Sequence, residues 1–196
     1  MSADPTQRDY VIIVSGLPRS GTSMMMKAIE AGGIEPLIDH IRKADEDNPK
    51  GYYEFEPVKK TKEDASWLKD APGKVVKMVY RLLYDLPADH QYRVIFTHRD
   101  LKEVLASQAK MLKRSGKSGG GISDEQMEGL FTAELDKCKK WLAARPNFKV
   151  LYINHRDMIN DGRSQAEMIN TFLAGGLDVD AMASVVDPAL YRNRNQ

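Results

Sequence analysis

The sequence predicts an α/β fold with three layers, in which a central, mostly parallel sheet is flanked by helices. Four short apolar runs predict strands, and each run is continuous rather than alternating, which is typical of parallel strands covered on both faces. The predicted strands are residues 10–15, 74–79, 93–97 and 149–153. Helical patterns fall between and after them, at residues 22–31, 57–70, 101–114, 124–144 and 164–174. Strands that alternate with helices in this way are typical of a doubly wound fold.

The ends of these helices carry local signals of their own. Three helix starts have the pattern of a capping box, in which a short polar side chain and a longer one three residues later exchange hydrogen bonds with the backbone. The pairs are Asp100 with Glu103, Ser123 with Gln126, and Ser164 with Glu167. Gly32 and Gly33 predict the end of the first helix.

The length and charge of the chain limit the classes of protein that it can be. With 196 residues, 42% of them hydrophobic, the chain is long enough for one sizeable core, so we expect a single domain over residues 1–196. A formal net charge of +1 gives no electrostatic case for nucleic acid or an anionic membrane as a partner. The N-terminal segment is polar, and no apolar run approaches the roughly 20 residues of a membrane helix. We therefore expect a cytoplasmic protein without a membrane span.

Cysteine and histidine are too few and too scattered for a disulfide framework or a metal site. Cys138 is the only cysteine in the sequence, which favours a reducing compartment. The four histidines are at positions 40, 90, 98 and 155, without the close spacing of metal ligands. We therefore expect no bound metal.

The most informative stretch is residues 11–23, VIIVSGLPRSGTS, where a buried strand passes through a glycine-bounded turn into a helix. Such a turn points successive backbone N–H groups inward, and the helix start adds partial positive charge, so an anion is the expected ligand. Gly16, Gly21 and Ser23 match the P-loop pattern G-x-x-x-x-G-K-[ST], but Thr22 replaces its lysine. Arg19 supplies a cation from within the turn instead. The alternative is an ordinary strand-to-helix turn with no ligand.

A second motif with the same logic covers residues 93–107, RVIFTHRDLKEVLAS. A buried strand ends at His98 and Arg99, Asp100 starts a helix, and Ser107 lies two turns along it. Residues seven apart share one face of a helix, so the helix start and Ser107 can contact the same group, and a second phosphate fits there. Alternatively, Arg99 pairs with a surface acid and Ser107 faces solvent.

Together, the two motifs make the chain resemble the sulfotransferase family, whose members transfer a sulfuryl group from phosphoadenosine phosphosulfate (PAPS). The family pattern P-[KR]-S-G-T-[TS] after the first strand is matched by Pro18, Arg19, Ser20, Gly21, Thr22 and Ser23. Its arginine at a strand end, with a serine eight residues later, is matched by Arg99 and Ser107. The resemblance implies a three-layer fold of the P-loop type. It also implies that the first motif binds the 5′ end of the donor and that Arg99 and Ser107 bind its 3′-phosphate.

The resemblance extends over nearly the whole chain and is strongest to small bacterial members. It is supported by the segments KGYYEFEPV, LLYDLP and VDPALYRNR. His155 falls where many relatives have a tyrosine near the donor. The glycine-and-lysine segment that closes over the donor in longer relatives is absent. Arg192 and Arg194, or the basic glycine-rich loop at residues 113–121, are candidates to replace it, although a frayed tail and a plain flexible connection are the alternatives.

The general base is not fixed by the resemblance, because the histidine that many relatives carry after the second strand is missing from KMVYRLL. The remaining candidates are Glu54, Glu56, Asp39 and His40. We favour Glu54, since it follows Tyr52 and Tyr53 and an apolar environment makes a carboxylate more basic. The alternative is that Glu54 and Glu56 only form surface ion pairs with Lys59 or Lys60.

The resulting expectation is a PAPS-dependent sulfotransferase that acts on a hydroxyl or amine of a small molecule, lipid or saccharide and releases PAP. Arg19 is expected to neutralise charge on the leaving group, with help from backbone N–H groups of residues 20–23. A P-loop kinase of small molecules is the first alternative, and Thr22 in the lysine position argues against it. A catalytically silent protein that binds PAPS or PAP on the same fold is the second.

Overall fold

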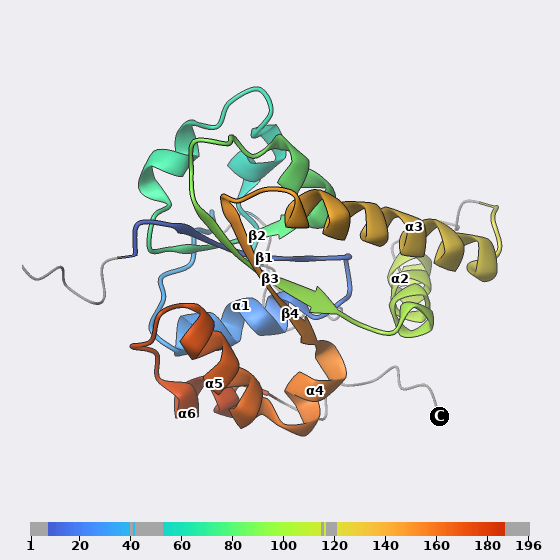
Figure 1. Cartoon of the computed structure of the whole chain (residues 1–196). Helices are drawn as coiled ribbons and strands as arrows, with labels where there is room; N and C mark the ends of the chain where they lie inside the picture. The colour runs from blue at the N-terminus through green and yellow to red at the C-terminus, as the bar shows by residue number, and fades with distance from the viewer. Residues whose placement is uncertain (1–7, 40, 42–52, 115, 117–120, 187–196) are drawn as a thin grey trace, which may run out of the picture.

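A single parallel sheet organises the computed structural model, which describes residues 8–39, 41, 53–114, 116 and 121–186. Within these residues the strands are β1 (Val11–Gly16), β2 (Val75–Val79), β3 (Tyr92–His98) and β4 (Phe148–Asn154). Their order across the sheet is β2-β1-β3-β4, and every neighbouring pair is parallel (Figure 1). The predicted α/β fold is confirmed, and all the predicted strands are present with small shifts at their ends.

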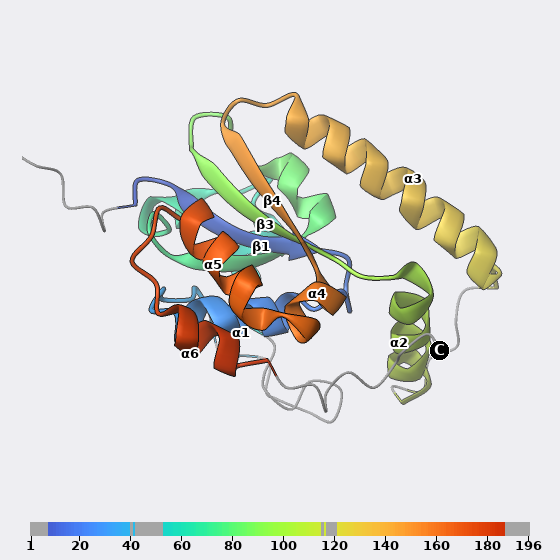
Figure 2. The ribbon, with the colours of Figure 1, turned by 60° about the horizontal axis from the view of Figure 1, so that its bottom comes forward.

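Helices cover both faces of the sheet, which gives the expected three layers (Figures 1 and 2). On one face lie α1 (Thr22–Ala31), α4 (His155–Asn160), α5 (Gly162–Phe172) and α6 (Val179–Ser184). On the other lie α3 (Asp124–Ala143) and the short 3-10 helices η1 (Glu56–Lys60), η2 (Ser66–Asp70) and η3 (Tyr80–Asp85). The helix α2 (Leu101–Arg114) follows β3 at the carboxyl edge of the sheet and packs beside α3.

Each face of the sheet has its own apolar core, because side chains alternate along a strand. In β1, Val11 and Ile13 are buried on the face covered by α3 and the 3-10 helices. Ile12 and Val14 are buried on the opposite face, which α1, α5 and α6 cover. This burial on both faces explains why the strand sequences are continuously apolar.

The predicted helix at residues 57–70 is wrong as a single α-helix. The structure has η1 and η2 there, separated by a turn in which polar side chains bond locally. Asp64 Oδ1 accepts the Ser66 N–H at 2.9 Å, and Trp67 Nε1 donates to Thr61 Oγ1 at 3.1 Å. Such side-chain bonds compete with the regular helical pattern.

The capping predictions have three different outcomes. The Ser123–Gln126 box is complete, with both reciprocal hydrogen bonds present. Asp100 Oδ1 accepts the Glu103 N–H at 3.1 Å, which is one of the two bonds of the predicted box, and Glu103 Oε2 also lies 2.9 Å from Arg99 Nε. The Ser164–Glu167 box is wrong, because Asp161 caps α5 and its Oδ1 accepts the Ser164 N–H at 3.1 Å.

The parallel sheet brings the ends of its strands to one edge, where both sequence motifs lie. Gly16 is paired with Val79 of β2 and with Thr97 of β3, so the turn after β1 starts beside the end of β3. Ligands of open α/β sheets bind at this carboxyl edge. Among the described residues, we find no helix with the length and hydropathy needed to cross a membrane.

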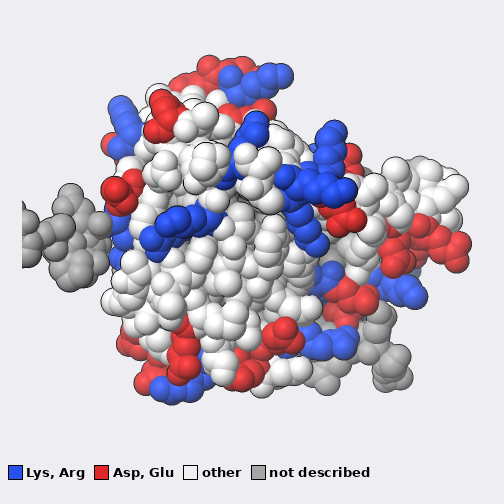
Figure 3. Space-filling model, viewed as in Figure 1, with Lys and Arg blue, Asp and Glu red and all other residues white. Residues whose placement is uncertain are grey.

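Charged side chains of both signs are distributed around the face of the molecule seen in Figure 3, and the middle of that face is uncharged. No broad surface of one sign extends over this view. On this face, attraction for an anionic ligand must therefore come from local groups.

Candidate functional site

The turn between β1 and α1 is held in a conformation that requires left-handed backbone angles. Gly16 has φ 148°, Arg19 has φ 74° and Gly21 has φ 98°. A Cβ atom on Gly16 would lie 2.6 Å from Thr97 Oγ1 and 2.7 Å from the Thr97 carbonyl oxygen. Gly16 therefore lets the turn lie directly against β3, and left-handed residues in such a turn can form a concavity for anions.

The buried side chain of Ser20 connects this turn to β3. Its hydroxyl lies 2.7 Å from both the Leu17 carbonyl oxygen and Thr97 Oγ1. The Ser20 N–H also donates to the Leu17 carbonyl at 3.1 Å. Helical bonding in α1 begins with the Met25 N–H, which donates to the Gly21 carbonyl at 3.1 Å. Since the first N–H groups of a helix have no intrahelical acceptor, Thr22 and Ser23 supply the donors best placed for an anion.

The two sequence motifs are joined by hydrogen bonds. Arg19 Nε donates to Ser107 Oγ at 2.9 Å, and Arg99 Nη1 donates to the Arg19 carbonyl at 3.2 Å. Gln108 Nε2 adds a bond of 3.3 Å to the Pro18 carbonyl. The structure therefore brings Arg19, Arg99 and Ser107 together, with Arg19 extended toward α2.

The burial of Ser107 and of the partner of Arg99 tests the alternative interpretation of the second motif, a surface ion pair and a solvent-facing serine. Ser107 is only 4% exposed, so the alternative that it faces solvent is wrong. Arg99 does pair with an acid, but that acid is Glu103, whose side chain is 2% exposed and whose Oε2 lies 2.9 Å from Arg99 Nε. The pair is thus a buried one beside the turn.

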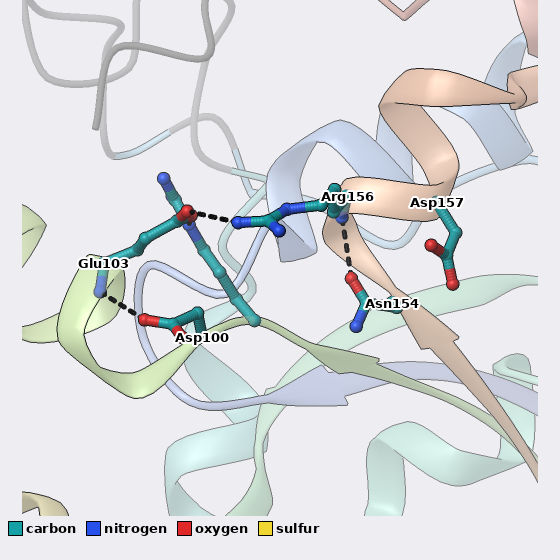
Figure 4. A pocket seen from close by; sticks show the side chains of 6 residues that line it. Asp100, Glu103, Asn154, Arg156 and Asp157 are labelled. Atoms are coloured by element: carbon teal, nitrogen blue, oxygen red, sulfur yellow. Dashed lines mark hydrogen bonds and ion pairs between the residues drawn. The ribbon is translucent and has the colours of Figure 1, made fainter. Parts of the chain in front are cut away.

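An open pocket of about 250 Å³ adjoins this pair (Figure 4). Its lining residues come from the start of α2 and the start of α4, namely Arg99, Asp100, Glu103, Asn154, Arg156 and Asp157. Arg156 Nη2 lies 3.3 Å from Glu103 Oε1, and the Arg156 N–H donates to Asn154 Oδ1 at 2.8 Å. Glu103 and Arg156 were not candidates from the sequence, although the spacing of Arg99 and Glu103 is that of a helical ion pair.

The ring of His155 packs against the turn at Gly21. A Cβ atom on Gly21 would lie 2.5 Å from His155 Cδ2, so only glycine leaves room for this ring. Burial, followed by the positive charge of Arg99, lowers the pKa of His155 to about 4. The imidazole is therefore neutral near pH 7 and contributes shape and polarity to the site, without charge.

The candidate general bases lie beyond β2, at the other side of the turn. Residue 36 pairs in parallel with Val75 of β2, so the chain after it runs toward the carboxyl edge of the sheet. There the Asp39 N–H donates to the Glu54 carbonyl at 3.2 Å. The Tyr53 hydroxyl bonds to Glu30 of α1.

The three described carboxylates differ in their partners. Asp39 Oδ2 accepts the Glu56 N–H at 2.6 Å and Oδ1 accepts the Ile41 N–H at 3.0 Å. The Glu56 N–H is the main reason why the pKa of Asp39 lies below its usual range. Lys59 Nζ lies 2.5 Å from Glu56 Oε1 and 3.9 Å from Glu54 Oε2, so the ion pairs of the alternative interpretation are present with Lys59.

Several of the residues singled out in the sequence lie outside the described ranges. These are Tyr52, His40, Arg192, Arg194 and most of the loop at residues 113–121. Within the described residues, no group of three or more His, Cys, Asp or Glu side chains is arranged to hold a metal ion.

A strand, a left-handed turn and a helix at the carboxyl edge of a parallel sheet are typical of P-loop-type folds, and comparisons with known proteins identify the family. Residues 9–194 match the sulfotransferase domain family, so the chain belongs to that family. A comparison with curated proteins finds no significant match. Family membership supports transferase activity and sulfuryl transfer as its general reaction.

The comparison with solved structures finds matches at low sequence identity. The sulfotransferase domain of the olefin synthase from Synechococcus PCC 7002 aligns with a TM-score of 0.50 and 14% identity. That alignment covers 100% of this chain and 92% of the other. An unliganded sugar kinase from Janibacter sp. HTCC2649 aligns with a TM-score of 0.40 and 11% identity, over 92% of this chain and 97% of that one.

Proposed function

We propose that this protein transfers a sulfuryl group from PAPS to a hydroxyl or amine of a small molecule, lipid or saccharide. The observation that carries the proposal is the hydrogen-bonded link between the left-handed turn and the pair Arg99 and Ser107 through Arg19. PAPS has a phosphosulfate at one end and a 3′-phosphate at the other, and therefore needs two separate anion sites that lie within one nucleotide of each other.

The residues of the turn fit the anionic 5′ end of such a donor. Gly16, Arg19 and Gly21 have the left-handed angles that turn backbone N–H groups inward, and α1 begins directly afterwards. When bound, PAPS supplies an activated sulfuryl group. For that chemistry Arg19 would neutralise the charge of the leaving phosphate, and the N–H groups of Thr22 and Ser23 would orient it.

The second end of the donor would lie against Arg99 and Ser107. Arg99 is held by a buried carboxylate and by the Arg19 carbonyl, so its guanidinium is already oriented without ligand. Ser107 presently accepts a hydrogen bond from Arg19, and a phosphate here would compete for Ser107 or accept from Arg19 itself. Arg19 belongs to the turn and also bonds to Ser107 and Arg99, so it would lie between the two ends of the bound donor.

A small-molecule kinase and a silent PAP-binding protein are the competing functions. Thr22 stands at the position where a nucleotide-binding P-loop has its phosphate-binding lysine, which argues against the kinase. A catalytically silent protein would bind PAP as an enzyme does but would not transfer the sulfuryl group. Activity measurements on a panel of acceptors distinguish the two.

PAP should stabilise the protein against heat in the absence of any divalent metal. A ligand present at 100 times its dissociation constant adds about 2.7 kcal/mol to the free energy of unfolding. The measurement is the melting temperature with PAP in EDTA, compared with ATP plus Mg²⁺. Stabilisation by ATP with Mg²⁺ and none by PAP would support the kinase instead.

Replacing Arg19 by alanine should lower kcat by roughly 10²–10³-fold, the usual effect of removing one donor to a developing anion. The backbone angle of Arg19 is already left-handed in a non-glycine residue, so alanine adds no new backbone strain. The measurement is PAP release from PAPS with hydroxyl and amine acceptors, and Arg19→Lys, which keeps the charge, should retain part of the activity. A wild-type protein that binds PAP but transfers to no acceptor would identify the silent protein.

A further inference from the structure

Arg99 and a second arginine both line the pocket. The second is Arg156, at the start of α4 (Figure 4). Both guanidinium groups bind the same carboxylate. Arg99 Nε lies 2.9 Å from Glu103 Oε2, and Arg156 Nη2 lies 3.3 Å from Glu103 Oε1. Two elements that are distant in the sequence thus place two cations on one side of the pocket.

The two arginines differ in how firmly the fold holds them. The side chain of Arg99 is 10% exposed, whereas that of Arg156 is 52% exposed. The buried contact of Arg99 with Glu103 fixes the orientation of its guanidinium. An ion pair with one half-exposed partner contributes little, so Arg156 can exchange Glu103 for another anion at small cost.

Two other acidic residues, Asp100 and Asp157, also line the pocket. Asp100 Oδ1 accepts the Glu103 N–H at 3.1 Å, where it caps α2. Asp157 points away from the Glu103 carboxylate (Figure 4). Glu103 pairs with both guanidinium groups, with Arg99 through Oε2 and with Arg156 through Oε1.

The pocket is connected to the turn that the proposed function assigns to the 5′ end of the donor. Arg99 Nη1 bonds to the Arg19 carbonyl, and the ring of His155, next to Arg156, packs on Gly21. A nucleotide with its 5′ end in the turn therefore has Arg99 and Arg156 together on one side of it.

We propose that Arg156 is a donor-binding residue that contacts the same 3′-phosphate as Arg99 and leaves Glu103 when the donor binds. This inference rests on the proposed function. A phosphate dianion has enough oxygens to accept hydrogen bonds from two guanidinium groups at once. Arg99 and Ser107 alone would leave some of these oxygens without a donor. Arg156 is then a specificity residue, because it recognises the one group that separates PAP from AMP.

The test is isothermal titration of PAP and of AMP into the wild type and into Arg156→Ala. We expect Arg156→Ala to weaken PAP binding by about tenfold or more, as the loss of a charge-assisted hydrogen bond implies, and to leave AMP binding unchanged. Arg156→Lys, which keeps the charge but not the fork, should recover part of the affinity for PAP.

Arg163→Ala is the matched control. Arg163 of α5 is 64% exposed and pairs with Glu167 of the same helix and with Asp180 of α6. Its removal should change neither affinity. An equal loss in this control would overturn the proposal, since it would indicate a general effect of surface charge.

Two further outcomes would also overturn it. Unchanged PAP affinity in Arg156→Ala, or equal losses for PAP and AMP, contradicts the assignment to the 3′-phosphate while leaving the proposed function intact. Failure of the wild type to bind PAP overturns the proposed function and this inference together. Circular dichroism of each variant shows whether it is folded under the conditions of the titration.

Discussion

Replacing Glu103 by alanine should lower the free energy of unfolding by about 3–5 kcal/mol, the usual cost of removing one partner of a buried ion pair. Glu103 is 2% exposed and its main partner, Arg99, is 10% exposed, so the remaining guanidinium would be left in the protein without its carboxylate. The contact with Arg156 adds little, because that side chain is half-exposed. Urea denaturation of the wild type and the variant measures the difference.

Two variants separate the charge of Glu103 from its size and its place in the helix. Glu103→Gln keeps the volume and loses the charge, so its destabilisation should fall between those of the wild type and Glu103→Ala. Glu167 forms a helical ion pair with Arg163 at 3.3 Å but is 58% exposed, and Glu167→Ala should change stability by less than about 0.5 kcal/mol. A loss in Glu103→Ala no larger than in Glu167→Ala would contradict the buried-pair explanation.

The fold could be predicted where local sequence and tertiary burial agree. The run VIIV is apolar at every position because β1 is covered on both faces, and this pattern alone indicates a central parallel strand. The first helix was placed at residues 22–31, as found, because good helix formers end at two glycines. The prediction of one helix over residues 57–70 is wrong because Asp64 accepts a hydrogen bond from the Ser66 N–H and Thr61 accepts one from Trp67. Helix propensity does not predict such local side-chain bonds.

The sequence predicts which residues form the candidate site, but it does not predict the hydrogen bonds and ion pairs between them. Arg19 and Ser107 were identified from separate motifs, yet their hydrogen bond joins residues 88 apart and depends on how α2 packs beside the turn. Glu103 was interpreted only as a helix-capping residue, because its role comes from Arg99 and from Arg156 on another element. Contacts between distant segments follow from packing, which a single sequence does not encode in its periodicity.

The structure also separates the candidate general bases by their present partners. Both carboxylate oxygens of Asp39 accept backbone N–H groups, which stabilise its ionised form and make it a weak base. Glu56 is 45% exposed and pairs closely with Lys59. Glu54 is 22% exposed and its Oε2 lies 3.9 Å from Lys59 Nζ, so of the two glutamates it is less exposed and farther from that lysine. We therefore propose Glu54 as the base that accepts the proton of the acceptor.

Replacing Glu54 by glutamine should lower kcat by roughly 10²–10⁴-fold, the range attributed to general acid–base catalysis. Because Glu54 lies beyond β2 and apart from Arg99 and Ser107, the affinity for PAP should not change, which separates loss of the base from loss of the donor site. Glu56→Gln is the matched control. Glu56 lies two residues after Glu54 and also pairs with Lys59, so this variant removes the same charge and should reduce kcat only a few-fold. Equal losses in the two variants would mean that Lys59, through its two ion pairs, is what the reaction needs, and the base would then have to be sought outside this pair of glutamates.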